Sequence, residues 1–520
     1  MPNFEPRVKG KEQPSSTPTP RRPSPAAQSL AGQAETPNVP AALRPGRRFR
    51  WWHAFTGVVA VLALIAVGLG WKILRVGSTV FGGTNHTSTL GQLGRLIVPG
   101  DRALLQDDNG RTNILLVGYG GPGHEGPYLA DTIILASLNQ TTNDVAMLSI
   151  PRDFLVELPG FGYRKINNAL AFGRTDEHPE GGDALITKAV QDVTGQTIHY
   201  FARVDFNGFK QAVDTLGGLD LTVDNPFIDT EYPTYNYGYQ TIRFAAGAQH
   251  LTGEQALQFS RSRHGNNGEG SDFARSARQQ KLLFAFRERA LSAGTLTNPG
   301  KISGLLDALG SHVNSTFELW EVARLAQIAQ DLTPDKVVTR VLDATVPDSL
   351  VRAGTGTDGA YIIQPRVGLG NYLELHELAA NLFPLNTVAK EHVSVQVQNA
   401  TGETGLAETV GHTLRGFAYD ILSIGTPKGV RYDQSVIVDL SNGRAPQTVA
   451  TLQRKYGANV TTSLPTDIQL AGGKPLTANL NRNAAPTNPQ VILILGTSAV
   501  AIVHSTTPPA ARNLPAASST

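Results

Sequence analysis

The chain has 520 residues, of which 40% are hydrophobic, and this is enough for two or three folded domains. It contains no cysteine, which excludes disulfides and thiolate metal sites. The net charge is only +2, and no basic stripe with interleaved aromatic residues indicates a nucleic-acid partner.

The N-terminal region divides into a charged part and an apolar part. Residues 1–50 carry nine Lys and Arg against three Glu, are rich in Pro, Ser and Ala, and show no apolar periodicity. We predict a disordered basic tail there. The following run, 54–71, has no charged residue and is flanked by Trp51, Trp52 and Lys72. Spanning a bilayer takes about 20 apolar residues, so we predict a transmembrane helix at 51–75.

The flanking charges predict the orientation of this helix. Arg47, Arg48 and Arg50 precede the apolar run, whereas only Lys72 and Arg75 follow it. The positive-inside rule then gives a single-pass cell-membrane protein with a cytoplasmic N-terminus and an extracytoplasmic bulk. A cleavable signal peptide is the alternative interpretation, but the charged segment before the run is long for one.

The rest of the chain reads as a polar stalk followed by a first domain. Residues 76–109 are polar and contain glycine, which is typical of a stalk. From residue 110, apolar strand patterns alternate with helical ones, which predicts an α/β fold with a central mixed sheet flanked by helices. We expect strands at 112–118, 133–138, 145–150, 199–206 and 219–224, and helices at 181–195, 207–218, 252–259 and 272–291.

Beyond residue 295 the pattern changes twice. Two helical patterns fall within 296–388, which we interpret as a helical extension or linker of the first domain. Alternating strand and helix patterns return at 389–500 and predict a second, small α/β domain. Residues 501–520 are rich in Pro, Ala and Ser, and we predict a disordered tail. The segment 226–250, with four tyrosines, is expected to form an irregular loop or a hairpin.

Charged residues gather at the ends of these elements. Asp131 precedes the first strand of a hairpin, and Arg152 and Asp153 follow the second. Arg261 and Arg263 follow a helix, and both would point the same way only in extended backbone. Several arginines with acids suit a multiply charged anion such as phosphate. The alternative is that these are solvated surface arginines.

Six blocks now justify a family comparison. NILLVGYGG, ADTIILASLN, LSIPRDF, KINNALAFG, GEQALQFSRSRH and DFARSARQQ occur in this order over about residues 110–295. Together they closely resemble the LytR-CpsA-Psr family. That resemblance implies a membrane-anchored phosphotransferase that moves a glycopolymer from a polyprenyl-pyrophosphate carrier onto peptidoglycan. Residues 392–497 are similar to the small C-terminal domain found on many such proteins.

The resemblance also implies roles for individual residues. In the family, arginines hold the pyrophosphate, and acids bind magnesium or act as a base. Asp131 would then be the metal ligand or the base, two roles that the sequence does not separate. Asp272 could instead be a simple helix cap, and Asp153 and Lys165 could instead orient Arg152 through a salt bridge. Carried over to this chain, the pyrophosphate-binding and catalytic positions are Asp131, Arg152, Asp153, Lys165, Asn167, Arg261, Arg263, Asp272, Arg275 and Gln279.

One position departs from the family pattern. An aspartate often stands twelve residues before the one that matches Asp131, and here that position is Tyr119. The paired-acid magnesium site is therefore altered, and His124 or Glu125 from the loop GYGGPGHEG is a candidate substitute ligand. The glycines of this loop could also hold phosphate through backbone N–H groups.

These inferences predict a glycopolymer transferase of cell wall biogenesis. Its partners would be a polyprenyl-pyrophosphate-linked glycan, peptidoglycan and the membrane, and its cofactor Mg²⁺. A hydrolase of polyprenyl pyrophosphate and a non-enzymatic scaffold that binds lipid-linked glycan or the wall are the two alternatives.

Overall fold

The computed structural model describes residues 103–124, 126–173, 181–234, 238–356, 358–427, 429–466, 474–475 and 488–506. The predicted basic tail (1–50), the predicted membrane span (51–75) and most of the predicted stalk lie outside these residues. Within the described part of the chain, no helix combines the length and apolar character that crossing a membrane requires.

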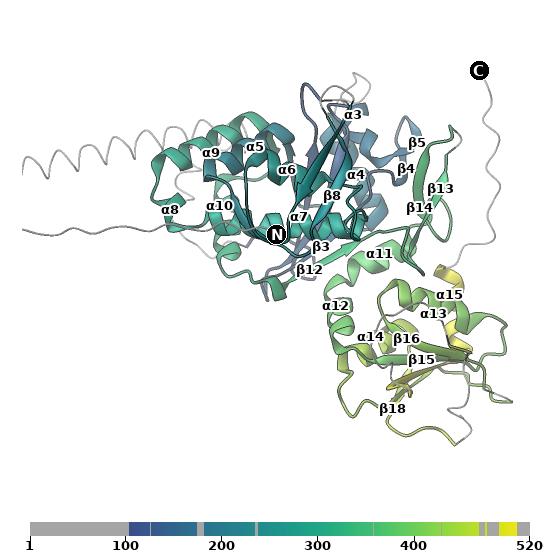
Figure 1. Cartoon of the computed structure of the whole chain (residues 1–520). Coiled ribbons are helices and arrows are strands. Elements are labelled where there is room, and N and C mark those ends of the chain that lie inside the picture. Colours follow the sequence, from purple (N-terminus) through teal and green to yellow (C-terminus); the bar gives the residue numbers. More distant parts are fainter. Residues whose placement is uncertain are drawn as a thin grey trace, which may run out of the picture. The chain divides into compact units, whose positions relative to one another are not determined.

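A six-stranded mixed sheet forms the centre of the first domain (Figure 1). The predicted hairpin is present, since β2 and β3 pair antiparallel across the turn at Asn139–Asp144. Strand β1 pairs antiparallel with β2 and parallel with β6. In spatial order the strands are β11 (Val313–Ser315), β6 (Tyr200–Asp205), β1 (Arg111–Tyr119), β2 (Ala130–Asn139), β3 (Asp144–Ser149) and β12 (Val337–Val341).

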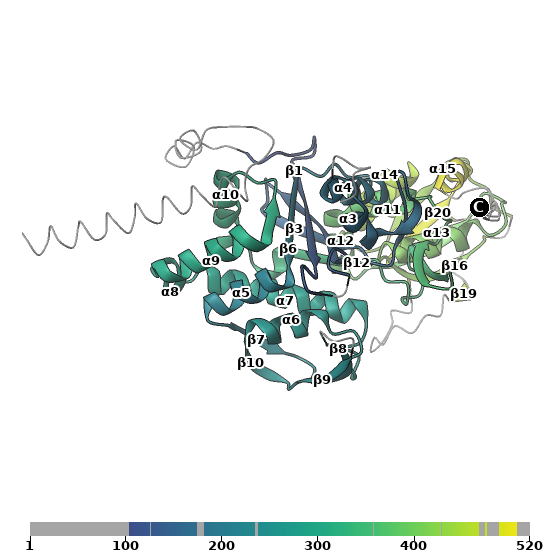
Figure 2. The same ribbon diagram turned by 90° about the horizontal axis from the view of Figure 1, so that it is seen from above.

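Helices cover both faces of this sheet, and alternation along the strands explains why. Leu115 of β1 belongs to the core that α4 completes with Ile186, whereas its neighbour Ile114 belongs to the opposite core, with Ile328 of α10. Successive side chains of a strand point to opposite faces, so a strand buried on both sides is apolar throughout. Figure 2 shows α10 on one side of the central strands and α3 and α4 on the other.

The helices of this domain follow the predicted periodic segments. Strands β11 and β12 lie in the segment interpreted as a helical extension, yet they form the two edges of the central sheet. The sheet therefore needs residues beyond 295 to be complete. The helices are α3 (Ala169–Phe172), α4 (Gly181–Thr194), α5 (Phe206–Leu216), α6 (Gly253–Arg261), α7 (Asp272–Ala290), α8 (Ala293–Leu296), α9 (Pro299–His312) and α10 (Leu319–Gln330).

Four two-stranded ribbons surround the sheet. Of the two alternatives for the tyrosine-rich segment 226–250, the hairpin is present, and a second ribbon lies within the segment that we interpreted as a helical extension or linker. The pairs are β4 (Leu155–Leu158) with β5 (Gly162–Lys165), β7 (Leu219–Val223) with β10 (Gly247–Leu251), β8 (Phe227–Pro233) with β9 (Tyr239–Phe244), and β13 (Val351–Thr355) with β14 (Tyr361–Pro365).

The second domain is a small α/β unit, as predicted. Its sheet has the order β18-β17-β20-β15-β16-β19, and β15 and β20 are buried along their whole length. Helix α15 extends to Thr506, so the prediction of disorder is wrong for residues 501–506. The rest of the predicted tail lies outside the described residues. Two helices, α11 (Leu373–Ala380) and α12 (Leu382–Glu391), lie mostly in the preceding segment that was interpreted as an extension or linker. The elements of the domain itself are β15 (Ser394–Asn399), α13 (Leu406–Gly416), β16 (Asp420–Gly425), β17 (Val436–Asp439), α14 (Pro446–Tyr456), β18 (Asn459–Thr461), β19 (Lys474–Pro475), β20 (Val491–Leu495) and α15 (Ser498–Thr506).

Candidate active site

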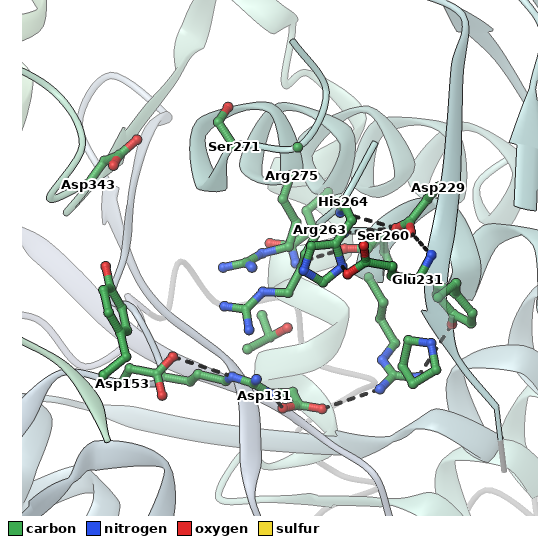
Figure 3. A pocket seen from close by; sticks show the side chains of 18 of the residues that line it. Asp131, Asp153, Asp229, Glu231, Ser260, Arg263, His264, Ser271, Arg275 and Asp343 are labelled. Atoms are coloured by element: carbon green, nitrogen blue, oxygen red, sulfur yellow. Dashed lines mark hydrogen bonds and ion pairs between the residues drawn. The ribbon is translucent and has the colours of Figure 1, made fainter. Parts of the chain in front are cut away.

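A cavity of about 550 Å³ lies where the predicted charged segments meet (Figure 3). It joins the start of β2, the residues after β3, the end of α6, the start of α7, the β8–β9 hairpin and β14. The predicted residues that line it are Asp131, Arg152, Asp153, Arg261, Arg263, Arg275 and Gln279. Segments separated by more than a hundred residues thus form one site.

Two arginines meet at a single carboxylate in this cavity. Arg152 donates through Nη1 to Oδ1 of Asp131 at 2.6 Å, and Nη2 of Arg261 lies 3.6 Å from Oδ2 of the same residue. The Asp131 side chain is 22% exposed, so solvent and a ligand both have access to it. Guanidinium groups held in this way offer their remaining N–H donors to a bound anion.

The orientation of Arg152 is set by a second carboxylate. Oδ2 of Asp153 lies 3.7 Å from Nε of Arg152, and Lys165 donates to Oδ1 of Asp153 at 2.8 Å. Asn167 donates its backbone N–H to the carbonyl of Arg152. Lys165 and Asn167 are not among the residues that line the cavity. They therefore contact the groups that position Arg152, which differs from the direct ligand contact that the family comparison implied.

Arg261 is the last residue of α6, and local sequence explains its placement. Thr252 and Gln255 form a capping box that starts the helix. The prediction that both arginines follow the helix is therefore wrong for Arg261. The chain leaves the helix at Ser262, whose ψ is 135°, and Arg263 lies in non-helical backbone as predicted. The Arg261 guanidinium stacks over the ring of Phe206 at 4.1 Å and donates to the hydroxyl of Tyr232 at 3.4 Å.

A buried carboxylate fixes the loop that carries Arg263. Oδ2 of Asp229 accepts from the Ser262 hydroxyl at 2.6 Å and from the backbone N–H groups of Arg263 and His264, both at 3.2 Å. Burial alone would raise the pKa of Asp229, but the hydrogen bonds from Ser262, Glu231, His264 and Arg263 outweigh it and hold the pKa below its usual value. Asp229 thus stays ionised as an acceptor for this loop.

Arg278 closes the same loop from the other side. Its guanidinium donates to the carbonyls of Phe259, Ser262 and Glu269 at 2.9, 2.6 and 2.7 Å. It also donates to the Glu269 carboxylate at 2.6 Å, and the Arg278 side chain is only 4% exposed. These bonds reach the last turn of α6, at Phe259, and the segment between α6 and α7, at Ser262 and Glu269. Arg278 therefore determines where the backbone of the paired arginines lies.

The start of α7 supplies the remaining predicted residues. Its cap is Ser271, whose hydroxyl accepts from the N–H of Ala274, so the predicted capping role of Asp272 is corrected by one position. The Asp272 side chain lies outside the part that the structure describes. Gln279 donates to the carbonyl of Ser260 at 3.3 Å. Figure 3 shows Arg263 and Arg275 extending into the space above Asp131.

Tyr119 faces away from this chemistry. It pairs with Ala130 across β1 and β2 and is buried beneath the guanidinium of Arg203 at 5.3 Å. Burial raises the pKa of the Tyr119 phenol, which keeps it protonated at neutral pH. A buried neutral phenol is not the hard anionic oxygen that Mg²⁺ prefers. Tyr119 is therefore a core residue. Of positions 119 and 131, it is Asp131 that lines the cavity.

The glycine-rich loop supports the site from behind. Gly121 adopts a φ of +81°, and a Cβ there would lie 2.7 Å from Cβ of Asp205, so close packing accounts for this glycine. The described residues of this loop, 120–124 and 126–128, are not among those that line the cavity. The ring edge of His124 packs on Phe206, the residue under Arg261. Burial lowers the pKa of His124, and the positive charge of Arg261 lowers it further.

The donor set for magnesium is small. Within the described residues no group of three or more His, Cys, Asp or Glu forms a metal-binding cluster, and Glu125 lies outside them. Asp131 is the predicted ligand that lies in the cavity. Mg²⁺ commonly binds one or two carboxylates together with substrate phosphates and water, so a single protein carboxylate fits an ion that arrives with its phosphate ligand.

Sequence reasoning missed about two thirds of the residues that line the cavity. Most of them come from the tyrosine-rich hairpin and from the segment after β12, whereas His264 follows the paired arginines in the segment after α6. They include Asp229, Glu231, Tyr232, Tyr239, His264, Asp343, Thr345, Tyr361 and Ile363. The one available signal was the four tyrosines between residues 226 and 250, which are more than a simple connecting loop needs.

Replacing Arg278 tests whether it fixes the arginine loop. Arg278→Ala would leave three carbonyls and Glu269 without their donor and should destabilise the protein by about 3 kcal/mol or more. Chemical denaturation would measure this. The control is Lys281→Ala on the same helix, which removes a more exposed pair with Asp224 and should cost less than about 1 kcal/mol. Equal stabilities of the two variants would contradict the assigned role.

Asp229→Asn tests the depressed pKa of the buried carboxyl. An ionised Asp229 stabilises the fold above its unfolded-state pKa of about 4, and this contribution is lost as the pH falls through the lower folded-state pKa. The variant should therefore be less stable than the wild type by about 1–3 kcal/mol at pH 7. The difference in stability between the wild type and the variant should become smaller below about pH 4. Denaturation curves at both pH values would measure it, and a gap that does not change with pH would argue against an ionised Asp229.

Both domains of this chain are similar in sequence to known protein families. Residues 87–366 match the model of the LytR_cpsA_psr family, and residues 392–498 match that of the LytR cell envelope-related transcriptional attenuator. The chain is 36% identical over 219 residues to the polyisoprenyl-teichoic acid–peptidoglycan teichoic acid transferase TagU of Oceanobacillus iheyensis. That match covers 41% of this chain and 62% of TagU, which is less than two thirds of the relative.

Two further similarities extend the comparison. The chain is 28% identical over 468 residues to the cell wall biosynthesis protein LcpA of Corynebacterium glutamicum, which covers 80% of this chain and 82% of LcpA. The crystal structure of TagV from B. subtilis is 26% identical, with a TM-score of 0.40, and covers 53% of this chain and 98% of that one. Because the LytR_cpsA_psr model matches more than half of the residues of this chain, the chain belongs to the LytR-CpsA-Psr family.

Proposed function

We propose that this protein is a phosphotransferase that moves a glycopolymer from a polyprenyl-pyrophosphate carrier onto peptidoglycan. The observation that carries the proposal is the meeting of Arg152 and Arg261 at Asp131, with Arg263 and Arg275 lining the same cavity. Four guanidinium groups from three chain segments match the charge and the directional acceptors of a pyrophosphate diester.

The reaction that fits this site is a substitution at phosphorus, in which the oxygen of a sugar hydroxyl replaces the bridging oxygen of the pyrophosphate. A sugar hydroxyl of peptidoglycan attacks the phosphorus next to the glycan, and a new P–O bond forms. The bond from that phosphorus to the bridging oxygen breaks, polyprenyl phosphate leaves, and the hydroxyl proton passes to a base. Arginines placed beforehand around the phosphates stabilise the charge that develops on these oxygens.

The names of the relatives support this substrate class. TagU of O. iheyensis is named for transfer of teichoic acid from a polyisoprenyl carrier to peptidoglycan, and LcpA of C. glutamicum is named for cell wall biosynthesis. We extend that class to this chain because its family blocks supply Asp131 and the four arginines of the cavity. That this chain transfers a glycopolymer is likewise part of the proposal.

Asp131 has two possible contributions in this scheme. It would accept the hydroxyl proton, or it would hold Mg²⁺ together with the phosphate oxygens, which supplies further positive charge at the transferred group. In both cases Arg152 and Arg261 position its carboxylate. Dependence of turnover on magnesium, measured on the wild type, separates these roles.

The proposed location is the outer face of the cell membrane. Support comes from the uncharged run at 54–71 and from the arginines before it. A polyprenyl carrier is confined to the membrane, so an enzyme that acts on it benefits from a membrane anchor. Protease accessibility of the C-terminal domain in intact cells tests this orientation.

An Arg261→Ala/Arg263→Ala double variant should lose the carrier. Mass spectrometry of solvent-extracted lipid from the full-length protein, purified in detergent, should find polyprenyl phosphate or pyrophosphate in the wild type. We expect at least a tenfold lower amount in the variant, because each charge-assisted hydrogen bond contributes about 1.5–3 kcal/mol.

The matched control is Arg243→Ala, an exposed arginine of β9 outside the cavity, which should retain the lipid. No lipid in the wild type, together with no binding of added carrier to folded protein, would contradict the proposal and favour a scaffold. Carrier binding with release of inorganic phosphate but without transfer would instead favour a hydrolase.

A further inference from the structure

Two hairpins form opposite walls of the cavity, and neither carries a residue of the arginine site. On one side, β14 lies next to Asp153, because the N–H of Ile363 donates to the Asp153 carbonyl at 2.9 Å. On the other side, Tyr232 of β8 accepts a hydrogen bond from Arg261. Since Arg152 and Arg261 flank Asp131, β14 and the β8–β9 hairpin border the two ends of the charged floor.

Each wall presents an exposed tyrosine. Tyr239, at the start of β9, is 72% exposed, and Tyr361, at the start of β14, is 51% exposed. Of the large hydrophobic side chains that are exposed in the described residues, three are aromatic, and two of these three line this one cavity. Single exposed tyrosines need no explanation, but two on opposite walls of one cavity indicate that a ligand covers them.

Carboxylates and hydroxyls accompany these rings. Glu231 lies in the cavity wall with a side chain that is 63% exposed. Asp343 accepts from the N–H and the hydroxyl of Thr345 through Oδ1. Figure 3 shows Asp343 and Glu231 on opposite sides of the view, with Arg263 between them. The walls thus offer hydrogen-bond acceptors beside the aromatic rings, whereas cations line the floor.

This chemistry selects among the parts of the substrate. The acids Glu231 and Asp343 would repel phosphate, and carboxylates in the wall are a poor surface for an apolar polyprenyl chain. A sugar ring has an apolar C–H face that packs on an aromatic ring and hydroxyls that donate to carboxylates. A neutral sugar therefore fits the walls better than either end of the carrier.

We propose that Tyr239 and Tyr361, with Glu231 and Asp343, form a sugar-binding subsite at the walls of the cavity. The proposal rests on the function proposed above. Its ligand is a pyranose ring, which the lipid-linked donor and the peptidoglycan acceptor both contain. The tyrosines select glycan-bearing substrate, and the arginines hold the pyrophosphate.

The test compares carriers with and without a sugar. Full-length protein in detergent is titrated with undecaprenyl pyrophosphate, with undecaprenyl-pyrophosphoryl-N-acetylglucosamine, and with a soluble disaccharide muropeptide of peptidoglycan. In Tyr239→Ala/Tyr361→Ala the affinity for a sugar-bearing ligand should fall about tenfold or more, because both aromatic contacts with the sugar ring are lost. The affinity for the sugar-free carrier should not change.

Two controls make the result specific. Tyr239→Phe/Tyr361→Phe keeps both rings and should retain most of the affinity, and Tyr163→Ala removes an exposed tyrosine outside the cavity and should have no effect. A loss restricted to the lipid-linked sugar assigns the subsite to the donor, and a loss restricted to the muropeptide assigns it to the acceptor.

Other outcomes overturn the subsite and also identify the step that failed. Unchanged affinity of the alanine double variant for both sugar-bearing ligands would reject the subsite and leave the proposed function intact. Equal losses for the sugar-bearing and the sugar-free carrier would also reject it, because the tyrosines would then act on the pyrophosphate site. A wild type that binds none of the three ligands would reject the proposed function together with the subsite.

Discussion

The site depends on holding several guanidinium groups close together before any anion binds. Like charges at this spacing repel one another, so each arginine needs a partner that does not use all of its donors. Asp131 is such a partner for both Arg152 and Arg261. The ring of Phe206 under Arg261 provides a second, uncharged contact. A pyrophosphate would then meet donors that are already oriented, which limits the reorganisation that binding requires.

Most of the surrounding structure maintains this arrangement. The β2–β3 hairpin places Asp131 and Arg152 at the same end of two paired strands. Asp229 and Arg278 fix the segment between α6 and α7 from opposite sides through buried, charge-assisted hydrogen bonds. The bond between the hydroxyls of Ser149 and Ser276 joins β3 to α7. The rigid elements therefore set the distances. Asp131, Arg261 and Arg275 lie near the ends of β2, α6 and α7, and Arg152 and Arg263 lie in the segments that follow β3 and α6.

The sequence predicted the elements with strong periodicity, but it did not predict the walls of the site. The hairpin strands and the start of α6 at Thr252 follow from short apolar runs and from capping chemistry, which are both local in sequence. The sequence allowed Lys165 either to contact the ligand or to orient Arg152 together with Asp153, and the structure shows an ion pair between Lys165 and Asp153. The position of Tyr361 depends on a ribbon that joins the site through the pairing of Phe154 with Ile363, a contact between residues about two hundred positions apart. Local patterns contain no information about such a contact.

The most direct test of the account is a double-mutant cycle on the two arginines that meet at Asp131. The affinity of wild type, Arg152→Ala, Arg261→Ala and the double variant for soluble farnesyl pyrophosphate would be measured by titration calorimetry. If both arginines bind one pyrophosphate, each single variant should weaken binding by about tenfold or more. The double variant should then depart from the sum of the two effects, because both residues share one ligand and one carboxylate. Affinities that do not change in the single variants would show that the pyrophosphate does not bind at Asp131 and would contradict the account.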